Sequence, residues 1–306
     1  MKIFFALKSG VIRSFKSWKG ILAVWFVTLL MSAMVALPLK GAFKSGLGSS
    51  MITERLADGI DIEVFSDLEG FGRIVASFGN GLFVIVIVYF IVNAFLTGGL
   101  FAGVRETNVS FTFSSFWRIS AANFGPFLGI LLIMNLLIIL LFIAVFIMPF
   151  SVISSGIQEE MKTIKTGVVI FSVFLLLFTI MIPVTDYARA WQVTQEKNRC
   201  LRAIGFGFSR TFRTFFSSWI LIIILLIVQL LYWWLVMKVL PGMKPSTGEG
   251  IILFFILSQV MFMIKIFLKV YRYGCITSMM ELTDSKISDL TPENPSYEKT
   301  DLLLWP

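Results

Sequence analysis

Three basic residues near the end of the chain are the strongest candidates for contact with a ligand. Lys265, Lys269 and Arg272 follow each other at spacings of four and three, so on a helix they lie on one face. A lysine or arginine near the end of a membrane span extends its charged group to the lipid phosphates, which accounts for Lys269 and Arg272. Lys265 lies deeper. It is therefore the best single candidate for contact with an anionic lipid or an anionic substrate.

Arg210 and Arg213 lie in a segment where arginines alternate with phenylalanines. Basic side chains at a membrane surface attract acidic headgroups, at about 1 kcal/mol each. We therefore expect Arg210 and Arg213 to contact anionic lipids of the inner leaflet. Nucleic acid is not an expected partner, because the basic residues lie where membrane topology already demands them.

Asp186 and Arg189 are three residues apart, a spacing at which their side chains meet on one helical face. They follow Pro183 at the end of an apolar segment, where charges are weakly screened. Two interpretations stay open. The residues form a structural ion pair that holds the inner end of a helix bundle together, or they form half of a gate.

Uncharged polar side chains are few in the apolar segments. The amides among them are Asn93, Asn135, Gln229 and Gln259, nearly one for each segment. Hydrogen bonds between helices are their usual role, typically worth less than about 1–2 kcal/mol. The alternative is that they line a polar cavity for a substrate.

The residue types exclude most familiar enzyme chemistry. The chain has no histidine, which excludes His-based catalytic triads, His haem ligands and His-containing zinc sites. Cys200 and Cys275 stand 75 positions apart without neighbouring metal ligands, and neither a phosphate-binding loop nor a G-x-S-x-G nucleophile motif occurs. No Asp or Glu falls within an expected span, so proton coupling through a buried carboxylate is not supported. We expect no enzymatic activity, no cofactor and no bound metal.

The elements that must position these residues are transmembrane helices. Of the 306 residues, 57% are hydrophobic and 14% are charged, against roughly 45–50% and 25% in soluble domains. A helix needs roughly 20 apolar residues to cross a hydrocarbon core of about 30 Å. The sequence therefore predicts an all-α polytopic membrane protein with six transmembrane helices, centred on residues 21–39, 82–104, 126–150, 167–185, 218–237 and 251–270.

The basic residues also predict the orientation. With the N-terminus inside and six spans, 18 of the 26 basic residues fall on the inner side and 8 on the outer side, whereas the 18 acidic residues divide equally. The positive-inside rule then places both termini in the cytoplasm. Both cysteines fall on the same reducing side, as expected of free thiols.

The chain divides into three parts. Residues 1–19 are expected to form an amphipathic interfacial helix, residues 20–282 the six-helix transmembrane domain, and residues 283–306 a polar cytoplasmic tail. Within the second part, residues 40–81 are expected to form a helical extracytoplasmic cap, which covers the bundle or contacts a partner. The apolar stripe of the first helix consists of Phe4, Leu7, Val11, Phe15 and Trp18.

Aromatic and basic residues recur before the first, third and fifth spans, as in Phe116-Trp117-Arg118 and in residues 206–219. This recurrence predicts three repeats, each an interfacial helix followed by a helical hairpin, related by an axis along the membrane normal. The alternative is that the recurrence has no common origin, because helical membrane proteins gather aromatics and arginine at the inner interface. Part of residues 119–125 is expected to be an interfacial lead-in to the third span.

Short motifs carry a resemblance to a known group. Besides Phe116-Trp117-Arg118, they are the Gly98-Gly99 to Arg105 ending of the second span and the Asp186-Tyr187-Ala188-Arg189 ending of the fourth. With six spans, the pattern resembles a group of poorly characterised bacterial six-helix membrane proteins, related to the membrane domain of some glycerophosphodiester phosphodiesterases. The resemblance covers most of the chain from the first span to the sixth. It implies the bacterial cytoplasmic (inner) membrane and, without an attached phosphodiesterase domain, no catalytic function.

Two functions fit these observations. The leading hypothesis is a non-enzymatic scaffold or accessory subunit that works through anionic lipids of the inner leaflet or through a membrane protein partner. The runner-up is a small-solute or lipid transporter, with Asn93, Asn135, Gln229, Gln259 and Lys265 around a cavity. Convergence of these residues on one cavity favours the transporter, and hydrogen bonds from each of them to a neighbouring helix favour the scaffold.

Overall fold

The computed structural model describes residues 2–47, 71–105, 112–154, 159–194, 199–243 and 247–290, and no strand occurs among them. Six helices in this part of the chain are long and apolar enough to cross a membrane. The predicted all-helical class is therefore confirmed, and the number of helices that could span agrees with the six predicted. The expected amphipathic helices of the cap, around residues 52–68, lie outside the described residues, as does the tail from residue 291 onward.

The helices follow in the order expected from hydropathy. The two short amphipathic helices are α1 (Lys2–Lys16) and α9 (Cys200–Arg213). The long helices are α2 (Trp18–Leu47), α5 (Phe71–Arg105), α6 (Phe113–Phe142), α8 (Glu160–Gln192), α10 (Phe215–Gly242) and α11 (Gly248–Leu290). A π-helical turn (Ile143–Ile147) joins α6 to α7 (Met148–Ser154), so that α6 and α7 form one helical run.

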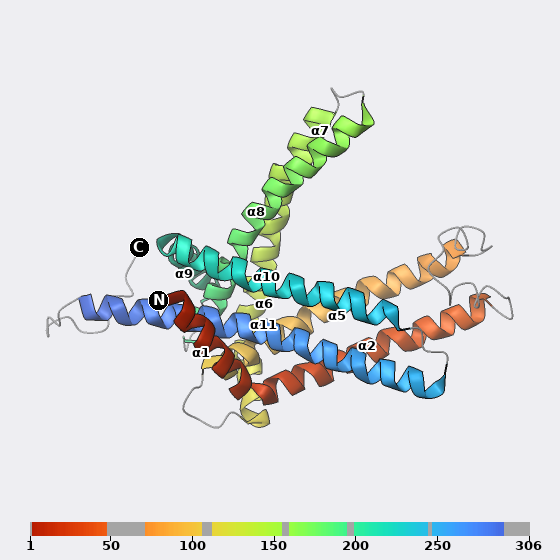
Figure 1. The fold of residues 1–306 in the computed structure, drawn as a ribbon, viewed down its shortest axis with the longest axis horizontal. Coiled ribbons are helices and arrows are strands. Elements are labelled where there is room, and N and C mark those ends of the chain that lie inside the picture. The colour runs from red at the N-terminus through yellow and green to blue at the C-terminus, as the bar shows by residue number, and fades with distance from the viewer. Residues whose placement is uncertain are drawn as a thin grey trace.

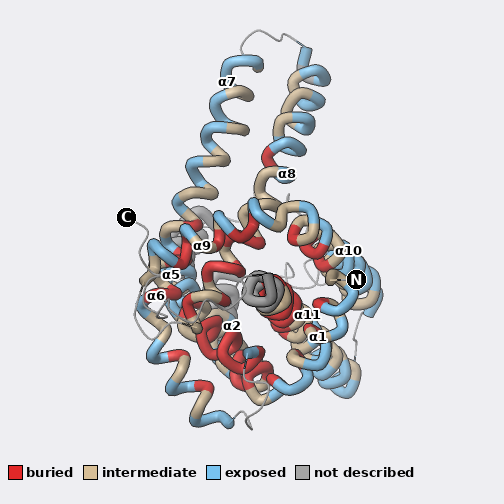
Figure 2. Tube along the Cα trace, turned by 90° about the vertical axis from the view of Figure 1, so that its left-hand side faces the viewer, coloured by how far each residue is buried: buried red, intermediate tan, exposed pale blue. Residues whose placement is uncertain are grey.

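Helix α11 is the centre of the bundle. It contacts α1, α2, α5, α8 and α10, and Figure 2 shows it end-on, inside the ring of the other helices, with buried stretches of the trace around it. Helices α2, α5, α10 and α11 run alongside one another in Figure 1. A residue on α11 therefore faces several helices, which makes this helix the natural place for a site.

The long helices extend beyond the bounds that the hydropathy pattern predicts. Of the expected cap, residues 40–47 belong to α2 and residues 71–81 to α5. Residues 119–125 are not a separate lead-in but part of α6, in which Pro126 is buried. Helix α8 continues beyond residue 185 to Gln192 and so includes Asp186, and α11 continues to Leu290, beyond the expected start of the tail. Hydropathy alone therefore does not place the helix ends.

The amphipathic α1 packs through its small residues. Ala6, Gly10 and Ser14 are buried, and Gly10 lies close to Gly274 and Cys275 of α11. Phe4 is 75% exposed, whereas Leu7 packs against the core and the Phe15 ring lies 4.9 Å from that of Phe267 on α11. Part of the predicted stripe is therefore exposed for lipid contact and part packs on the bundle.

Two further contacts have the same form. The first turns of α6 pack on the end of α5, where Gly99 lies against Phe116 and Ser120. Helix α9 packs on the end of α8, where Gly207 lies against Val184 and Ala188. In all three contacts a small residue permits close approach of the two backbones.

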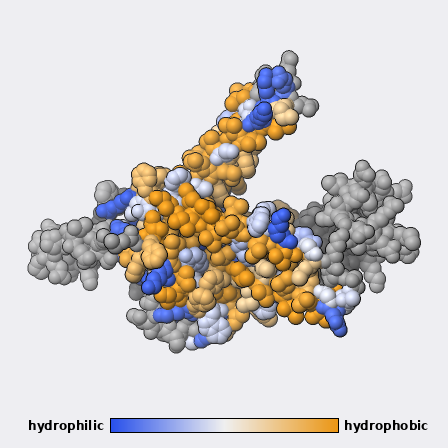
Figure 3. Space-filling model, in the orientation of Figure 1, coloured by the Kyte–Doolittle hydropathy of each residue, from blue (hydrophilic) through white to orange (hydrophobic). Residues whose placement is uncertain are grey.

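The outer part of α6, with α7 and the first half of α8, forms a hairpin that projects from the bundle (Figure 1). Edge-to-face phenylalanine pairs join its two arms, among them Phe146 and Phe171, with ring centroids 5.6 Å apart. Its visible surface is apolar except at the tip, as is much of the bundle in Figure 3. Such a surface is expected of a protein surrounded by lipid.

Candidate anion-binding cavity

Lys265 lies near the middle of the long apolar part of α11, seventeen residues after Gly248 and eighteen before Thr283. The helix continues without a break from Gly248 to Leu290, so the spacing of Lys265, Lys269 and Arg272 places their Cα atoms along one side of it. The three residues span about 10 Å of the helix axis, at 1.5 Å per residue.

These three residues line one cavity of about 190 Å³ between α2, α5, α10 and α11. The volume exceeds the roughly 30 Å³ that one water molecule occupies in the liquid. Its other polar wall residues are Thr28, Tyr89, Asn93 and Gln229, and its apolar wall residues are Val24, Met31, Val92, Leu96, Phe262 and Ile266.

The two lysines have different surroundings. Lys269 Nζ donates a hydrogen bond to Asn93 Oδ1 at 2.8 Å, which links α11 to α5. Among the side chains that the structure describes, no carboxylate lies within 4.0 Å of either ammonium group. The lysines therefore give this part of the cavity an uncompensated positive charge.

Arg272, at one end of the cavity, has a buried counter-ion. Its Nε lies 2.9 Å from Asp186 Oδ2, and Asp186 is only 1% exposed. Neither Arg272 Nε nor Asp186 Oδ2 has a hydrogen-bond partner, so the contact is an ion pair and not a hydrogen bond. Arg189 Nη1 lies 3.8 Å from Asp186 Oδ1, at the spacing that the sequence suggests. Asp186 thus pairs more closely with Arg272 of another helix than with its neighbour on α8.

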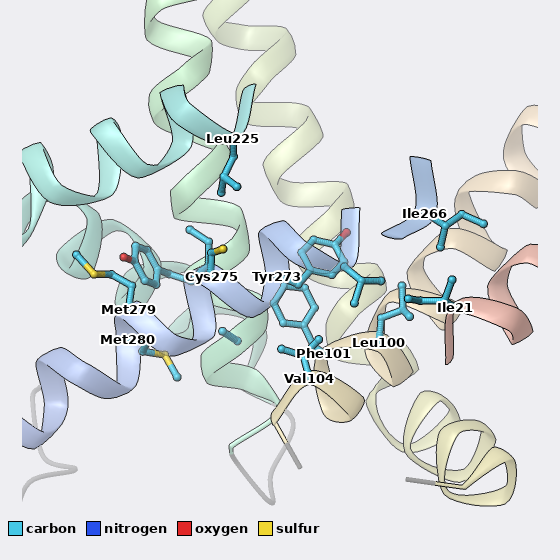
Figure 4. Close-up of a cluster of buried hydrophobic side chains, with 14 of the residues drawn as sticks. Ile21, Leu100, Phe101, Val104, Leu225, Ile266, Tyr273, Cys275, Met279 and Met280 are labelled. Carbon is cyan, nitrogen blue, oxygen red and sulfur yellow. The ribbon is translucent and has the colours of Figure 1, made fainter. Parts of the chain in front are cut away.

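Aromatic side chains fill the bundle next to Arg272. Tyr273 stacks on Phe101 with ring centroids 4.2 Å apart, and both side chains lie in the buried cluster of Figure 4 with Val104 and Leu100. The ring of Tyr273 also lies 5.5 Å from the Arg272 guanidinium and 6.0 Å from the Lys269 ammonium. Tyr187 hydroxyl and Ser218 Oγ, at 2.9 Å, join α8 to α10 in the same layer.

The four predicted amides divide into two pairs. Asn93 and Gln229 line the cavity with Lys265. Asn135 lies elsewhere and donates to the carbonyl oxygen of Leu131 in its own helix at 2.8 Å. Gln259 also lies outside this cavity and accepts a hydrogen bond from Trp25 Nε1 at 3.1 Å, which joins α11 to α2. The structure therefore brings together only half of the predicted set.

Arg210 differs from its predicted role. It is buried, and its Nη2 donates to the carbonyl oxygen of Met280 at 2.8 Å, so it is placed to hold α9 on α11 rather than to contact lipid. The reason is its position on the packed face of α9, with Ala203, Gly207 and Thr211. Arg213 is exposed and remains placed for contact with a headgroup.

Sequence reasoning missed two polar residues of the cavity wall, Thr28 and Tyr89. Each has a hydroxyl group within an apolar span, and a polar group in such a span is a candidate for a functional site. Thr28 Oγ1 donates to the carbonyl oxygen of Val24 at 2.7 Å, so its hydrogen is already engaged and an oxygen lone pair remains.

Comparison with known proteins adds no assignment to this geometry. No protein-family model matches the chain, and neither a curated protein sequence nor a solved structure matches it.

Proposed function

We propose that this chain is a non-enzymatic membrane carrier that binds an anionic lipid or solute between α2, α5, α10 and α11. The observation that carries the proposal is the presence of Lys265 and Lys269 in one intramembrane cavity, without a carboxylate within 4.0 Å among the described side chains. A lysine near the centre of a membrane helix costs about 3 kcal/mol on insertion scales. An anionic ligand offsets this cost.

The charges around the cavity support an anion rather than a cation. Asp186 balances Arg272, to which it is ion-paired at 2.9 Å. Lys265 and Lys269 line the cavity, to which Asn93 of α5 and Gln229 of α10 add amide groups. A cation entering this cavity meets two positive charges in a medium of low dielectric constant, whereas an anion meets two attractive ones.

The geometry favours the carrier over the scaffold. A scaffold needs no polar cavity, and Asn135 and Gln259 do satisfy their hydrogen bonds within or between helices, as that hypothesis expects. Asn93, Gln229 and Lys265 instead converge from three helices on one cavity. That convergence is the arrangement by which a carrier recognises its substrate.

The membrane placement belongs to this proposal. Arg13, Arg105 and Arg213 all lie near the end of the bundle that carries α1 and α9, called here the α1/α9 end. The positive-inside rule makes that end cytoplasmic. We accordingly place both termini in the cytoplasm and the protein in a bacterial inner membrane.

The threefold repeat is also part of the proposal. Its support is that α6 packs on α5, α9 on α8, and α1 on α11, so that each lead-in helix contacts the return helix of the preceding unit. The helix is interrupted at Ser17, seven residues after Gly10, and at Thr214, seven residues after Gly207. These matching positions favour a common origin over a chance gathering of aromatics.

Binding of a short-chain anionic lipid tests the function. Purified full-length protein in neutral detergent is titrated calorimetrically with dioctanoyl phosphatidate and with zwitterionic dioctanoyl phosphatidylcholine. We expect the phosphatidate to bind selectively. Lys265→Met should weaken this binding at least tenfold, because it removes a charge within the cavity while keeping an unbranched side chain.

Lys238→Met is the matched control. Lys238 is exposed at the far end of α10, beside Trp234 and away from the cavity, so its replacement should leave the affinity unchanged. Equal binding of the two lipids, or equal affinity of Lys265→Met and the wild type, overturns the proposal. Movement of fluorescent phosphatidate between the leaflets of proteoliposomes then tests the carrier step.

A further inference from the structure

A second hollow leaves the cavity and runs along the surface between α10 and α11. It has a volume of about 420 Å³ and shares three residues with the cavity: Gln229, Phe262 and Lys265. Because both hollows touch the same lysine, the groove begins where the positive charge lies. The groove and the cavity are thus neighbours with three wall residues in common.

The groove differs in chemistry from the cavity. Beyond the shared residues, its wall is largely apolar and aromatic, with Leu226, Leu230, Tyr232, Trp233, Val236, Leu240, Ser258 and Met261. The Tyr232 hydroxyl donates to the carbonyl oxygen of Met261, which joins the two helices beside the groove and satisfies its own polar group. A wall of this kind offers burial to a hydrocarbon chain and little to a hydrophilic solute.

The groove is long enough for an acyl chain. Its wall follows α10 from Leu226 to Leu240, fourteen residues further on, which is about 21 Å at 1.5 Å per residue. Half of a hydrocarbon core of about 30 Å is about 15 Å. The groove therefore accommodates an extended acyl chain that reaches across one leaflet.

The direction of the groove indicates how a ligand is oriented. The cations succeed each other from Lys265 toward Arg272 and the α1/α9 end, whereas the groove runs from Lys265 the opposite way, to Leu240. A ligand that fills both has its headgroup nearer to the α1/α9 end than its chain. Since Lys265 lies near the middle of the apolar part of α11, the chain lies in the half of the bundle away from the α1/α9 end.

The charge count indicates the headgroup. Lys265 and Lys269 supply two positive charges beyond those balanced by Asp186. A phosphate monoester carries about −1.5 to −2 charges at neutral pH and offers several acceptor oxygens. It therefore matches the two lysines more closely than a phosphodiester, which carries a single charge.

We propose, building on the proposed function, that the ligand is a phosphate-monoester lipid. Its phosphate lies between Lys265 and Lys269 in the cavity, and one hydrocarbon chain lies in the groove between α10 and α11. A free phosphate ester has the same headgroup chemistry, but it leaves the apolar groove unfilled.

Two neighbouring leucines test the place of the chain. Leu230 lines the groove and Leu231 does not, although their side chains are almost equally exposed, at 63% and 62%. Leu230→Trp should therefore weaken the binding of dioctanoyl phosphatidate at least tenfold by filling the groove, whereas Leu231→Trp should leave the affinity unchanged. The melting temperature of each variant without lipid shows whether its fold is intact.

Chain length provides a test in the wild-type protein. Affinity should rise from glycerol 3-phosphate, which has the headgroup without chains, through dihexanoyl to dioctanoyl phosphatidate, with at least a hundredfold difference between the extremes. Equal affinities along this series, or equal effects of Leu230→Trp and Leu231→Trp, overturn the lipid inference. If binding still depends on Lys265, the proposed anion site survives; if that dependence is also absent, the proposed function fails with it.

Discussion

At the scale of single residues, the buried Asp186 sets the charge balance of the cavity. It lies between Arg272 of α11 and Arg189 of its own helix, at 2.9 Å and 3.8 Å respectively. Without this carboxylate, Arg272 adds a third uncompensated positive charge at the end of the cavity. Asp186 therefore influences both the stability of the bundle and the field that a ligand meets.

Replacement of Asp186 by Asn should destabilise the protein by about 3–5 kcal/mol, because it leaves a largely buried guanidinium without its counter-ion. Unfolding by sodium dodecyl sulfate in mixed micelles, followed by tryptophan fluorescence, measures the change. Arg189→Gln is the comparison, and we expect a smaller loss because Arg272 still compensates the carboxylate. Equal losses in the two variants contradict the dominant role given to the contact between α8 and α11.

The candidate site was only partly predictable from the sequence. The spacing of Lys265, Lys269 and Arg272 on one helix is local, so their common face follows from helix geometry alone. The pairing of Asp186 with Arg272 joins residues 86 positions apart, and only tertiary packing brings them together. The same reason explains why Gln229 reaches the cavity and Asn135 does not, although both are single amides in apolar helices.

At the scale of the elements, small residues determine how the amphipathic helices dock. Gly207 of α9 faces the carbonyl oxygen of Val184, and the backbone nitrogen of Ala188 lies 3.2 Å from the place of an added Cβ atom. Gly205, on the same helix, has no atom of another element within 4 Å of such a Cβ. Replacement of each of these glycines by alanine therefore distinguishes the effect of helix packing from that of helix propensity.

Gly207→Ala should destabilise the protein by about 1–3 kcal/mol, because the added methyl group pushes α9 away from α8. Gly205→Ala should instead stabilise the protein by at most about 1 kcal/mol, because alanine has a better helix propensity than glycine. Thermal unfolding in detergent measures both changes. Unchanged or increased stability of Gly207→Ala contradicts the close approach of α9 and α8.

Arg210 shows what an aromatic and basic pattern does not reveal. Its neighbours Phe208 and Phe212 suggest a helix that lies flat on lipid, but Ala203, Gly207, Arg210 and Thr211 follow each other at helical spacing and form the packed face. Small residues at intervals of four are the better signal for a helix contact. The exposed Arg213 lies off this stripe.

At the scale of the whole molecule, hydropathy was sufficient to predict the six long apolar helices, because the length and composition of each segment indicate a span on their own. It was not sufficient to place the helix ends, since α8 and α11 continue into polar residues beyond their apolar parts. Nor does hydropathy indicate that α6 and α7 project with α8 as a separate hairpin (Figure 1). That arrangement depends on contacts between phenylalanines distant in sequence.

The two native thiols provide a test of the orientation. A membrane-impermeant maleimide should label Cys200 in inside-out vesicles and not in right-side-out vesicles, if the α1/α9 end is cytoplasmic. Cys275 is buried and should react only after unfolding. Burial raises the pKa of the Cys200 thiol, so less thiolate is present at neutral pH, and the labelling rate should continue to rise into the alkaline range.

Lys238→Cys in a Cys200→Ser background provides the reciprocal control. This position lies at the opposite end of α10 from α9, so it should be labelled only in right-side-out vesicles. Labelling of both positions from the same side contradicts the six-span orientation.

The contact between α1 and α11 joins the first helix of the chain to the last. Arg13 donates to Glu281, 268 residues further on, with Nη1 and Oε1 3.1 Å apart. A ribosome that adds roughly 5–20 residues per second needs roughly 15–50 seconds to synthesise the chain between them. During that time α1 has no α11 to pack against. Its apolar residues allow it to bind flat on the membrane surface instead. The order of synthesis thus gives the aromatic face of α1 a use before the bundle is complete.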